Sequence, residues 1–138
     1  MKTAPLNTAV MFSKASDHWT TPKALYDALD AEFHFTFDPC PRHPDFDGLA
    51  VPWPGSVFIN PPYSNIAAFL KKGLDELRAE HTHTLVYLVP ARTDTQWFHT
   101  YCYGKAELRF LKGRLKFGDA TNSAPFPSML VIFRRPPP

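Results

Sequence analysis

The residues with the most distinctive chemistry in this chain of 138 residues are four in a row: Asn60, Pro61, Pro62 and Tyr63. Two successive prolines fix the backbone and remove two N–H donors, so the polar groups of this turn are oxygen acceptors. A rigid set of acceptors suits a ligand that donates hydrogens, such as an amino group. Four residues seen alone also match a turn in which prolines end a strand, so the position of this tetrad in the chain decides between the two interpretations.

The acceptors of the tetrad could turn an exocyclic amine into a nucleophile. If the Asn60 side-chain oxygen and the Pro61 carbonyl each accept one hydrogen, the nitrogen lone pair leaves conjugation and becomes available for attack. In methyl transfer from a sulfonium, positive charge moves to that nitrogen, and fixed dipoles stabilise the transition state more than the ground state. Tyr63 adds a ring on which a base taken out of a duplex could stack, worth about 1–3 kcal/mol. The tetrad therefore favours methyl transfer to an aminopurine.

The elements predicted around the tetrad place it at the end of a buried strand. The apolar run 57–59 is too short for a helix and suits a strand that is buried on both faces. After the tetrad, one apolar stripe predicts a helix from Ile66 to about Glu80. This position, between a buried strand and a helix, favours a functional role for the tetrad. Further strands are predicted at 84–89, 106–111 and 129–133, and a short helix at 94–101.

A second candidate position follows an earlier strand. Thr21 and Pro22 predict a helix start, with the threonine hydroxyl as a cap, and this helix should end near Glu32. The alternating segment 34–38 predicts a strand that ends at Asp38. Strands that alternate with helices indicate an α/β fold with three layers and a mixed, mostly parallel sheet. Because ligands bind beyond the carboxyl ends of such strands, Asp38 and the tetrad are candidates at the same edge.

The composition predicts one folded domain. The length fits a single domain, and 44% hydrophobic with 20% charged residues is typical of globular proteins. Fifteen prolines exclude a helical bundle. We expect a flexible N-terminal arm at 1–16, one domain at 17–135 and a frayed tail at 136–138. No apolar run approaches the roughly 20 residues that span a bilayer, so we expect no membrane contact and a place inside the cell.

Charge is distributed unevenly along the chain. Residues 1–104 contain 8 basic and 11 acidic residues, net −3, whereas residues 105–138 contain 7 basic and 2 acidic residues, net +5. Cations interleaved with apolar residues on a strand could face phosphates, although they could equally protect a strand edge from aggregation. The candidates for contact with nucleic acid are Arg92, Lys112, Arg114 and Lys116.

No metal site is predicted. Cys40 and His43 have ligand-like spacing, and His81 and His83 could be imagined as their partners, but the spacing between the two pairs matches no zinc pattern. We expect the histidines to be solvated residues at a helix end. Cys40 and the second cysteine, Cys102, should be free thiols.

The tetrad is accompanied by further motifs that extend over residues 17–133. They are Asp17 with Trp19, Thr21 and Pro22; Phe37-Asp38; Asp47-Gly48-Leu49 with Trp53; the segments 90–95 and 97–99; and the segments 113–117 and 124–129. Together these motifs resemble the phage-type DNA N6-adenine methyltransferases, which are S-adenosylmethionine-dependent relatives of the Dam enzymes. The resemblance implies a reduced Rossmann-like methyltransferase fold and a phage or prophage gene expressed in the bacterial cytoplasm.

The resemblance also implies roles for individual residues. The tetrad would bind the target amine, Asp38 would lie in the cofactor pocket, and the segment from Trp19 to Pro22 would close over the cofactor. The cofactor contacts expected from it are Trp19, Thr21, Pro22, Asp38, Pro39 and Cys40. The chain departs from methyltransferases at large because the loop 38–42 contains no glycine, and only residues 39–56 separate the first predicted strand from the tetrad strand. We therefore expect a shortened cofactor half of the sheet.

Three alternatives remain open from the sequence. Related tetrads serve enzymes that methylate N4 of cytosine or a glutamine amide in a protein, because these amines pose the same lone-pair problem. A catalytically silent DNA-binding module with the same fold is the third. The basic C-terminal quarter favours double-stranded DNA as the partner. So short a chain leaves no room for a separate recognition domain, so we expect either weak sequence specificity or specificity supplied by a homodimer.

Overall fold

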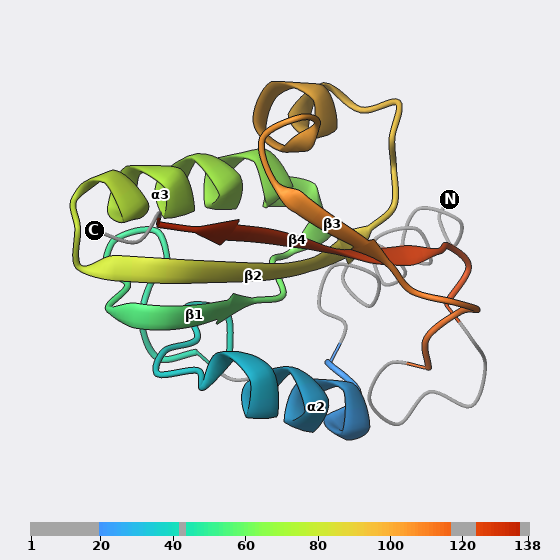
Figure 1. Cartoon of the computed structure of the whole chain (residues 1–138), viewed down its shortest axis with the longest axis horizontal. Coiled ribbons are helices and arrows are strands. Elements are labelled where there is room, and N and C mark those ends of the chain that lie inside the picture. The colour runs from blue at the N-terminus through green and yellow to red at the C-terminus, as the bar shows by residue number, and fades with distance from the viewer. Residues whose placement is uncertain (1–19, 42–43, 117–123, 136–138) are drawn as a thin grey trace, which may run out of the picture.

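A four-stranded sheet lies between two helices in the computed structural model of this chain, which describes residues 20–41, 44–116 and 124–135 (Figure 1). The predicted arm at 1–16 and the predicted tail at 136–138 lie outside these residues. The strands are β1 (Gly55–Ile59), β2 (Thr82–Pro90), β3 (Glu107–Phe110) and β4 (Ser128–Arg134). The strands predicted at 57–59, 84–89, 106–111 and 129–133 are thus all confirmed, with small differences at their ends.

The order of the strands in the sheet is β1-β2-β4-β3. β1 and β2 are parallel, but β4 runs antiparallel to both of its neighbours, β2 and β3. The sheet is mixed as predicted, but the expectation that it is mostly parallel is wrong. β3 and β4 follow each other in the chain, and neighbours that pair without a crossover helix lie antiparallel.

Two helices cover opposite faces of the sheet, α2 (Lys23–Phe33) on one side and α3 (Ile66–Arg78) on the other (Figure 1). α2 confirms the helix that was predicted to end near Glu32, and α3 begins at the predicted residue. A short 3-10 turn, η1 (Tyr63–Asn65), precedes α3, and a π-helical turn, η2 (Phe98–Cys102), overlaps the second half of the stretch predicted as a short helix. None of the helices described is long and apolar enough to cross a membrane.

Alternate residues of the strands enter two separate apolar clusters, one on each face of the sheet. The cluster under α3 contains Val57, Ile59, Leu85, Tyr87, Val89, Met129, Val131 and Phe133 from the strands. The cluster under α2 contains Phe58, Val86, Leu88, Leu130 and Ile132. This alternation is the period of two that an extended chain imposes, and it confirms the three predicted layers. The strands that hold the candidate site are therefore buried from both sides.

The segment 34–38 does not form the predicted strand. Only Phe37 makes a bridge, parallel to Val57 of β1. His34 ends α2 in the left-handed conformation, and the Asp30 side chain accepts a hydrogen bond from the Phe35 N–H at 2.8 Å. Backbone hydrogen bonds still join the segment to β1, from the Thr36 N–H to the Ser56 carbonyl at 2.7 Å and from the Phe58 N–H to the Phe37 carbonyl at 3.1 Å. The segment nevertheless runs beside β1, so Asp38 lies at the expected edge.

Ion pairs fasten the outer strand β3 to α2. Arg109 donates two hydrogen bonds to Glu32, each of 2.7 Å, and a third to Glu107 at 2.7 Å. The Arg109 and Arg134 guanidinium groups both lie over the Phe33 ring, 5.4 and 5.3 Å from its centroid. Paired Arg–carboxylate contacts of this kind fix geometry as well as charge. These contacts therefore hold β3 to α2 on the face of the sheet that α2 covers.

Replacing Gly73 in α3 by alanine is expected to destabilise the protein by about 1–3 kcal/mol, because the added methyl group would overlap the Tyr87 hydroxyl. It would also come within 3.1 Å of Leu85 and of Trp53. In an unobstructed helix the same change is stabilising by about 1 kcal/mol. Chemical denaturation would measure the free energy of unfolding. The cost of the alanine should shrink in a Tyr87→Phe background, and stabilisation in the wild-type background would contradict the packing described.

Candidate active site

The tetrad lies where β1 ends, at the carboxyl edge of the two parallel strands. Ile59, the last residue of β1, pairs with Tyr87 of β2, and Asn60 follows directly. Pro62 has an extended conformation, with φ −61 and ψ 132, and its carbonyl accepts a hydrogen bond from the Asn65 N–H at 2.9 Å. The prolines thus turn the chain sharply from the strand into η1. Asn60 and Tyr63 are brought to the sheet edge on a rigid turn.

The Asn60 side chain bonds to a residue 39 positions earlier in the chain. Its Nδ2 donates a hydrogen bond to Thr21 Oγ1 at 3.0 Å, in a half-buried position. Thr21 does not cap α2 as predicted. The N-cap residue is Pro22, and no side chain caps this helix. The structure therefore brings Thr21 and Asn60 together, although the resemblance implied separate roles for them.

Tyr63 is half-buried beside the same edge. Its ring meets Phe126 edge to face, with 5.3 Å between ring centroids. The Tyr63 hydroxyl is buried, and none of the residues described forms a hydrogen bond with it. Burial raises the pKa of this hydroxyl well above its ordinary value, and the positive charge of Arg92 opposes the shift. Arg92 therefore lies close enough to Tyr63 for its charge to affect this hydroxyl.

The loop that carries the predicted cofactor residues is held by a glycine from elsewhere. Gly48 lies so close to the backbone of buried Pro39 that a side chain at position 48 would overlap the Pro39 carbonyl. The indole N–H of buried Trp53 donates to the Gly48 carbonyl at 2.7 Å, which fixes the glycine from its other side. The loop at 38–42 contains no glycine of its own. Gly48 instead allows its own segment to lie close to this loop at Pro39.

The Asp38 carboxyl group is the polar centre of this loop. Its Oδ1 accepts a hydrogen bond from the Cys40 N–H at 2.8 Å. Burial raises the pKa of Asp38 to about 6, more than the hydrogen bond lowers it. Burial also raises the pKa of the Cys40 thiol well above its ordinary value, and the Asp38 charge adds to that shift. The Cys40 thiol is therefore protonated at neutral pH and unsuited to nucleophilic chemistry.

The basic segment at 112–116 follows β3, and apolar contacts connect it with the cluster on which Tyr63 packs. The Leu111 N–H donates to the Ser128 carbonyl at 3.1 Å, and the Ala124 N–H donates to the Leu115 carbonyl at 2.7 Å. Leu111, Leu115 and Tyr63 all pack on the cluster that contains Phe126. The predicted cations of this segment, Lys112, Arg114 and Lys116, are exposed. The segment that carries them therefore leaves the sheet at the edge where β2 ends and β4 begins, which is the edge that holds the tetrad.

Among the candidate residues named from the sequence, Trp19 and His43 lie outside the residues that the structure describes. His81 Nε2 lies 2.6 Å from a carboxyl oxygen of Glu76, where α3 leads into β2. No group of three or more histidine, cysteine, aspartate or glutamate side chains within 20–41, 44–116 and 124–135 is arranged to hold a metal ion.

Sequence reasoning gave no individual role to two residues that shape the site, Gly48 and Phe126. Both belong to motifs noticed in the sequence, Asp47-Gly48-Leu49 and the segment 124–129. A glycine beside an Asp in a proline-rich loop is a signal for close backbone approach. No local signal identifies the partner, because Gly48 meets Pro39 and Phe126 meets Tyr63 only through the fold.

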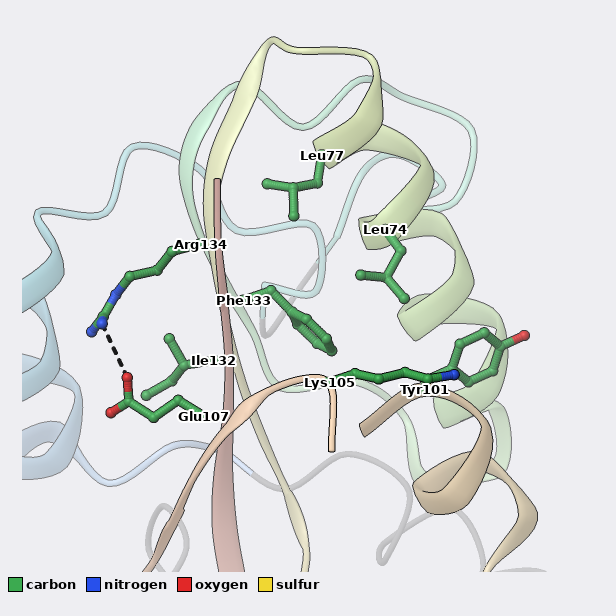
Figure 2. Close-up of a pocket in the computed structure, with 8 residues that line it drawn as sticks. All are labelled: Leu74, Leu77, Tyr101, Lys105, Glu107, Ile132, Phe133 and Arg134. Atoms are coloured by element: carbon green, nitrogen blue, oxygen red, sulfur yellow. Dashed lines mark ion pairs between the residues drawn. The ribbon is translucent and has the colours of Figure 1, made fainter. Parts of the chain in front are cut away.

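A pocket of about 420 Å³ lies elsewhere, between α3, η2 and the end of β4 (Figure 2). Leu74 and Leu77 of α3 face Phe133 across it, and the Glu107–Arg134 ion pair, 3.0 Å long, lies at its margin. Phe133 pairs with Leu85 in the first half of β2, whereas the tetrad adjoins the other end of the parallel strands. This pocket is therefore separate from the candidate active site.

A mixed α/β sheet with acceptor groups at this edge is consistent with a methyltransferase fold. Residues 9–137 match the model of the family described as DNA N-6-adenine-methyltransferase (Dam). The DNA N-6-adenine-methyltransferase of Haemophilus phage HP1 (strain HP1c1) is 26% identical over 136 residues, covering 85% of this chain and 78% of that protein. A protein of the same name from Escherichia phage T1 is 34% identical over 59 residues, covering 43% of this chain and 24% of that protein. The chain belongs to the Dam family of DNA N6-adenine methyltransferases, which confirms the predicted resemblance.

Replacing Asp38 by asparagine is expected to raise the free energy of unfolding at pH 8 by up to about 3 kcal/mol, at about 1.4 kcal/mol per pKa unit. The folded protein holds the Asp38 proton more tightly than the unfolded chain does, since the pKa is raised from 3.8 to about 6. The stability from this group is therefore complete below pH 3.8 and is lost as the pH rises through about 6.

Denaturation of both proteins between pH 4 and pH 8 would measure this difference. The gain from the asparagine should grow as the pH rises from 4 through about 6 and then level off toward pH 8. Exposed Asp45 lies in the same connection and serves as the control, because Asp45→Asn should leave the pH dependence unchanged. A constant difference between Asp38→Asn and the wild type at all pH values would contradict the burial of this carboxyl group.

Proposed function

We propose that this enzyme transfers a methyl group from S-adenosylmethionine to the N6 amino group of adenine in double-stranded DNA, with the target base extruded into the tetrad. The observation that carries the proposal is the position of Asn60 and Tyr63, on a rigid turn at the carboxyl edge of β1 and at the same sheet edge as an exposed basic segment. The names of the two phage relatives support adenine as the target.

In this mechanism the tetrad binds the amine and polarises it. The Asn60 side-chain oxygen and the Pro61 carbonyl each accept one hydrogen of the amino group, so its lone pair is directed away from the ring system. Positive charge that develops on the nitrogen is stabilised by these fixed dipoles, which need no reorganisation during the reaction. Tyr63 stacks on the extruded base and replaces part of the stacking energy lost from the duplex.

The residues around Asp38 fit a cationic, hydroxyl-bearing cofactor. When bound, S-adenosylmethionine supplies a methyl group activated by a sulfonium. The Asp38 carboxyl group is poorly solvated, as its raised pKa shows, and a cation or a hydroxyl donor beside it would compensate for that cost. We propose Pro22, Pro39 and Cys40 as its neighbours in the pocket, together with Trp19, which lies outside the described residues. Thr21, which the resemblance also implied, bonds to Asn60 through its hydroxyl instead.

The basic segment is proposed to hold the DNA backbone. Arg92, Lys112, Arg114 and Lys116 are exposed around the tetrad edge and are free to follow phosphates. Phe110 ends β3 beside them and is 64% exposed, which gives this surface an aromatic ring for contact with bases. Such a small contact surface provides few base contacts, so specificity is weak or depends on a homodimer. Both relatives come from phages, and we place the reaction in the cytoplasm of a bacterial host.

The first experiment incubates the purified protein with unmethylated duplex DNA and S-adenosylmethionine that carries a labelled methyl group. Mass spectrometry of the digested nucleosides then identifies the product. Labelled N6-methyladenine is the expected result. Label on N4-methylcytosine, or on glutamine of an added protein, would contradict the proposed target, and salt-dependent DNA binding without any label would favour the silent module.

Asn60→Ala is expected to lower methyl transfer at least a hundredfold, because the amine loses one of its two acceptors; a single donor removed from an oxyanion hole costs about 10²–10³ in kcat. Asn60→Asp should retain part of the activity, since a carboxylate also offers an acceptor oxygen. Asn65→Ala, at an exposed position in the same turn, is the matched control and should stay close to wild type. Activity of Asn60→Ala comparable to the control would refute the assignment.

Arg114→Ala and Lys116→Ala are each expected to reduce the slope of log binding constant against log salt by about 1, because each removes one phosphate contact. Fluorescence anisotropy with a duplex at several salt concentrations would measure the slope. Lys71→Ala is the control, because Lys71 is an exposed lysine that pairs with Asp75 on α3. Slopes equal to that of the control would reject a role for the two cations in DNA binding.

A further inference from the structure

We propose that Thr21 is a positioning residue that fixes the orientation of the Asn60 amide for methyl transfer; this inference rests on the proposed function. The observation is the hydrogen bond from Asn60 Nδ2 to Thr21 Oγ1, 3.0 Å long and half-buried. It joins the residue that receives the target amine to the segment that begins α2. The resemblance assigns Thr21 only to the cofactor, so the contact gives it a different task.

The orientation of the Asn60 amide decides whether the tetrad can act. A primary amide has an oxygen acceptor on one side and an NH₂ donor on the other. Only the orientation with the oxygen toward the target amine gives it an acceptor, because the reverse orientation sets donor against donor. When Nδ2 bonds to Thr21, Oδ1 is turned to the side of the amide away from Thr21. That is the orientation that the proposed mechanism needs.

The threonine hydroxyl also supports the amide while the amine is bound. In that state Oδ1 accepts from the amine, and the amide NH₂ needs acceptors of its own in a half-buried site. Thr21 Oγ1 provides one. Donation from Nδ2 to this oxygen also polarises the amide and makes Oδ1 a stronger acceptor, as in other hydrogen-bonded chains. Thr21 would thus act on the reacting nitrogen through Asn60.

The structure holds Thr21 rigidly enough for this task. Pro22 is the N-cap residue of α2, and its carbonyl accepts a hydrogen bond from the Tyr26 N–H at 3.0 Å. A residue before proline is restricted to extended conformations. Tyr26 in turn packs edge to face on Phe58 of β1, with 5.2 Å between ring centroids. None of the described side chains caps α2. The Thr21 hydroxyl therefore does not bond to the helix N-terminus and can accept the hydrogen bond from Asn60.

The test compares Thr21→Val, which removes the hydroxyl at nearly constant shape, with Thr21→Ser, which keeps it. Thr21→Val should lower kcat about ten- to a hundredfold, the range for one unsatisfied buried donor, with KM for DNA and Kd for the cofactor changed less than about threefold. Thr21→Ser should restore kcat to within about threefold of wild type. Thr84→Val is the matched control, because its hydroxyl contacts His83 at the start of β2, and it should leave kcat unchanged.

The same substitution in an Asn60→Asp background separates orientation from structural support. A carboxylate has two equivalent oxygens and so has no wrong orientation. Thr21→Val should therefore cost at least fivefold less in kcat in the Asn60→Asp protein than in the protein that keeps Asn60. Thermal unfolding of each variant shows whether it is folded at the assay temperature. If Thr21→Val is unstable, the test uses Thr21→Ser in its place, measured in the protein that keeps Asn60 and in the Asn60→Asp protein.

Three results would overturn the inference. They are a Thr21→Val protein with kcat within twofold of wild type, a Thr21→Ser protein as slow as Thr21→Val, and equal losses from Thr21→Val with and without the Asn60→Asp substitution. A weaker cofactor Kd with an unchanged single-turnover rate at saturation would make Thr21 a cofactor contact and would also reject the inference. Failure of the proposed function is distinguishable, because wild-type protein would then produce no N6-methyladenine.

Discussion

Burial of β1 on both of its faces holds the tetrad in place, and most other elements of the chain contribute to that burial. Val57 and Ile59 point into the cluster under α3, and Phe58 points into the cluster under α2. β2 pairs with one edge of the strand, and Phe37 bridges to the other. A strand held in four directions cannot shift in register, so the turn that follows it delivers Asn60 to one position.

Several features around this edge lower the local stability of the fold. α2 begins without a side-chain cap, which commonly contributes about 1 kcal/mol to a helix. The Asp38 carboxyl group is held where burial opposes its charge, and the Tyr63 hydroxyl is buried without a hydrogen-bond partner among the described residues. Costs of this kind concentrate at functional sites, where a substrate or cofactor can compensate for them. Their common location supports one site rather than several.

The short connection between Asp38 and β1 is held by packing instead of by additional strands. Trp53 is fully buried, and its indole N–H donates to the Gly48 carbonyl. Its backbone N–H donates to the Glu76 side chain of α3 at 2.7 Å. The loop is therefore anchored to a helix instead of to additional strands. Gly48 meets Pro39 at the same point, so the backbone near Asp38 is fixed by packing from the outside.

The amino-acid sequence alone determined β1, α3 and the position of the tetrad between them, because a short apolar run, a pair of prolines and a helical stripe are local patterns. It also determined that Asp38 and Asn60 lie at one edge, since both follow segments that run parallel. Only the tertiary structure decided that β4 runs antiparallel and that segment 34–38 forms a single bridge to β1 instead of a regular strand. It also decided that the Thr21 hydroxyl serves Asn60, 39 residues away. Periodicity reports which face of a segment is buried, whereas these contacts depend on where distant segments meet once both faces of the sheet are covered.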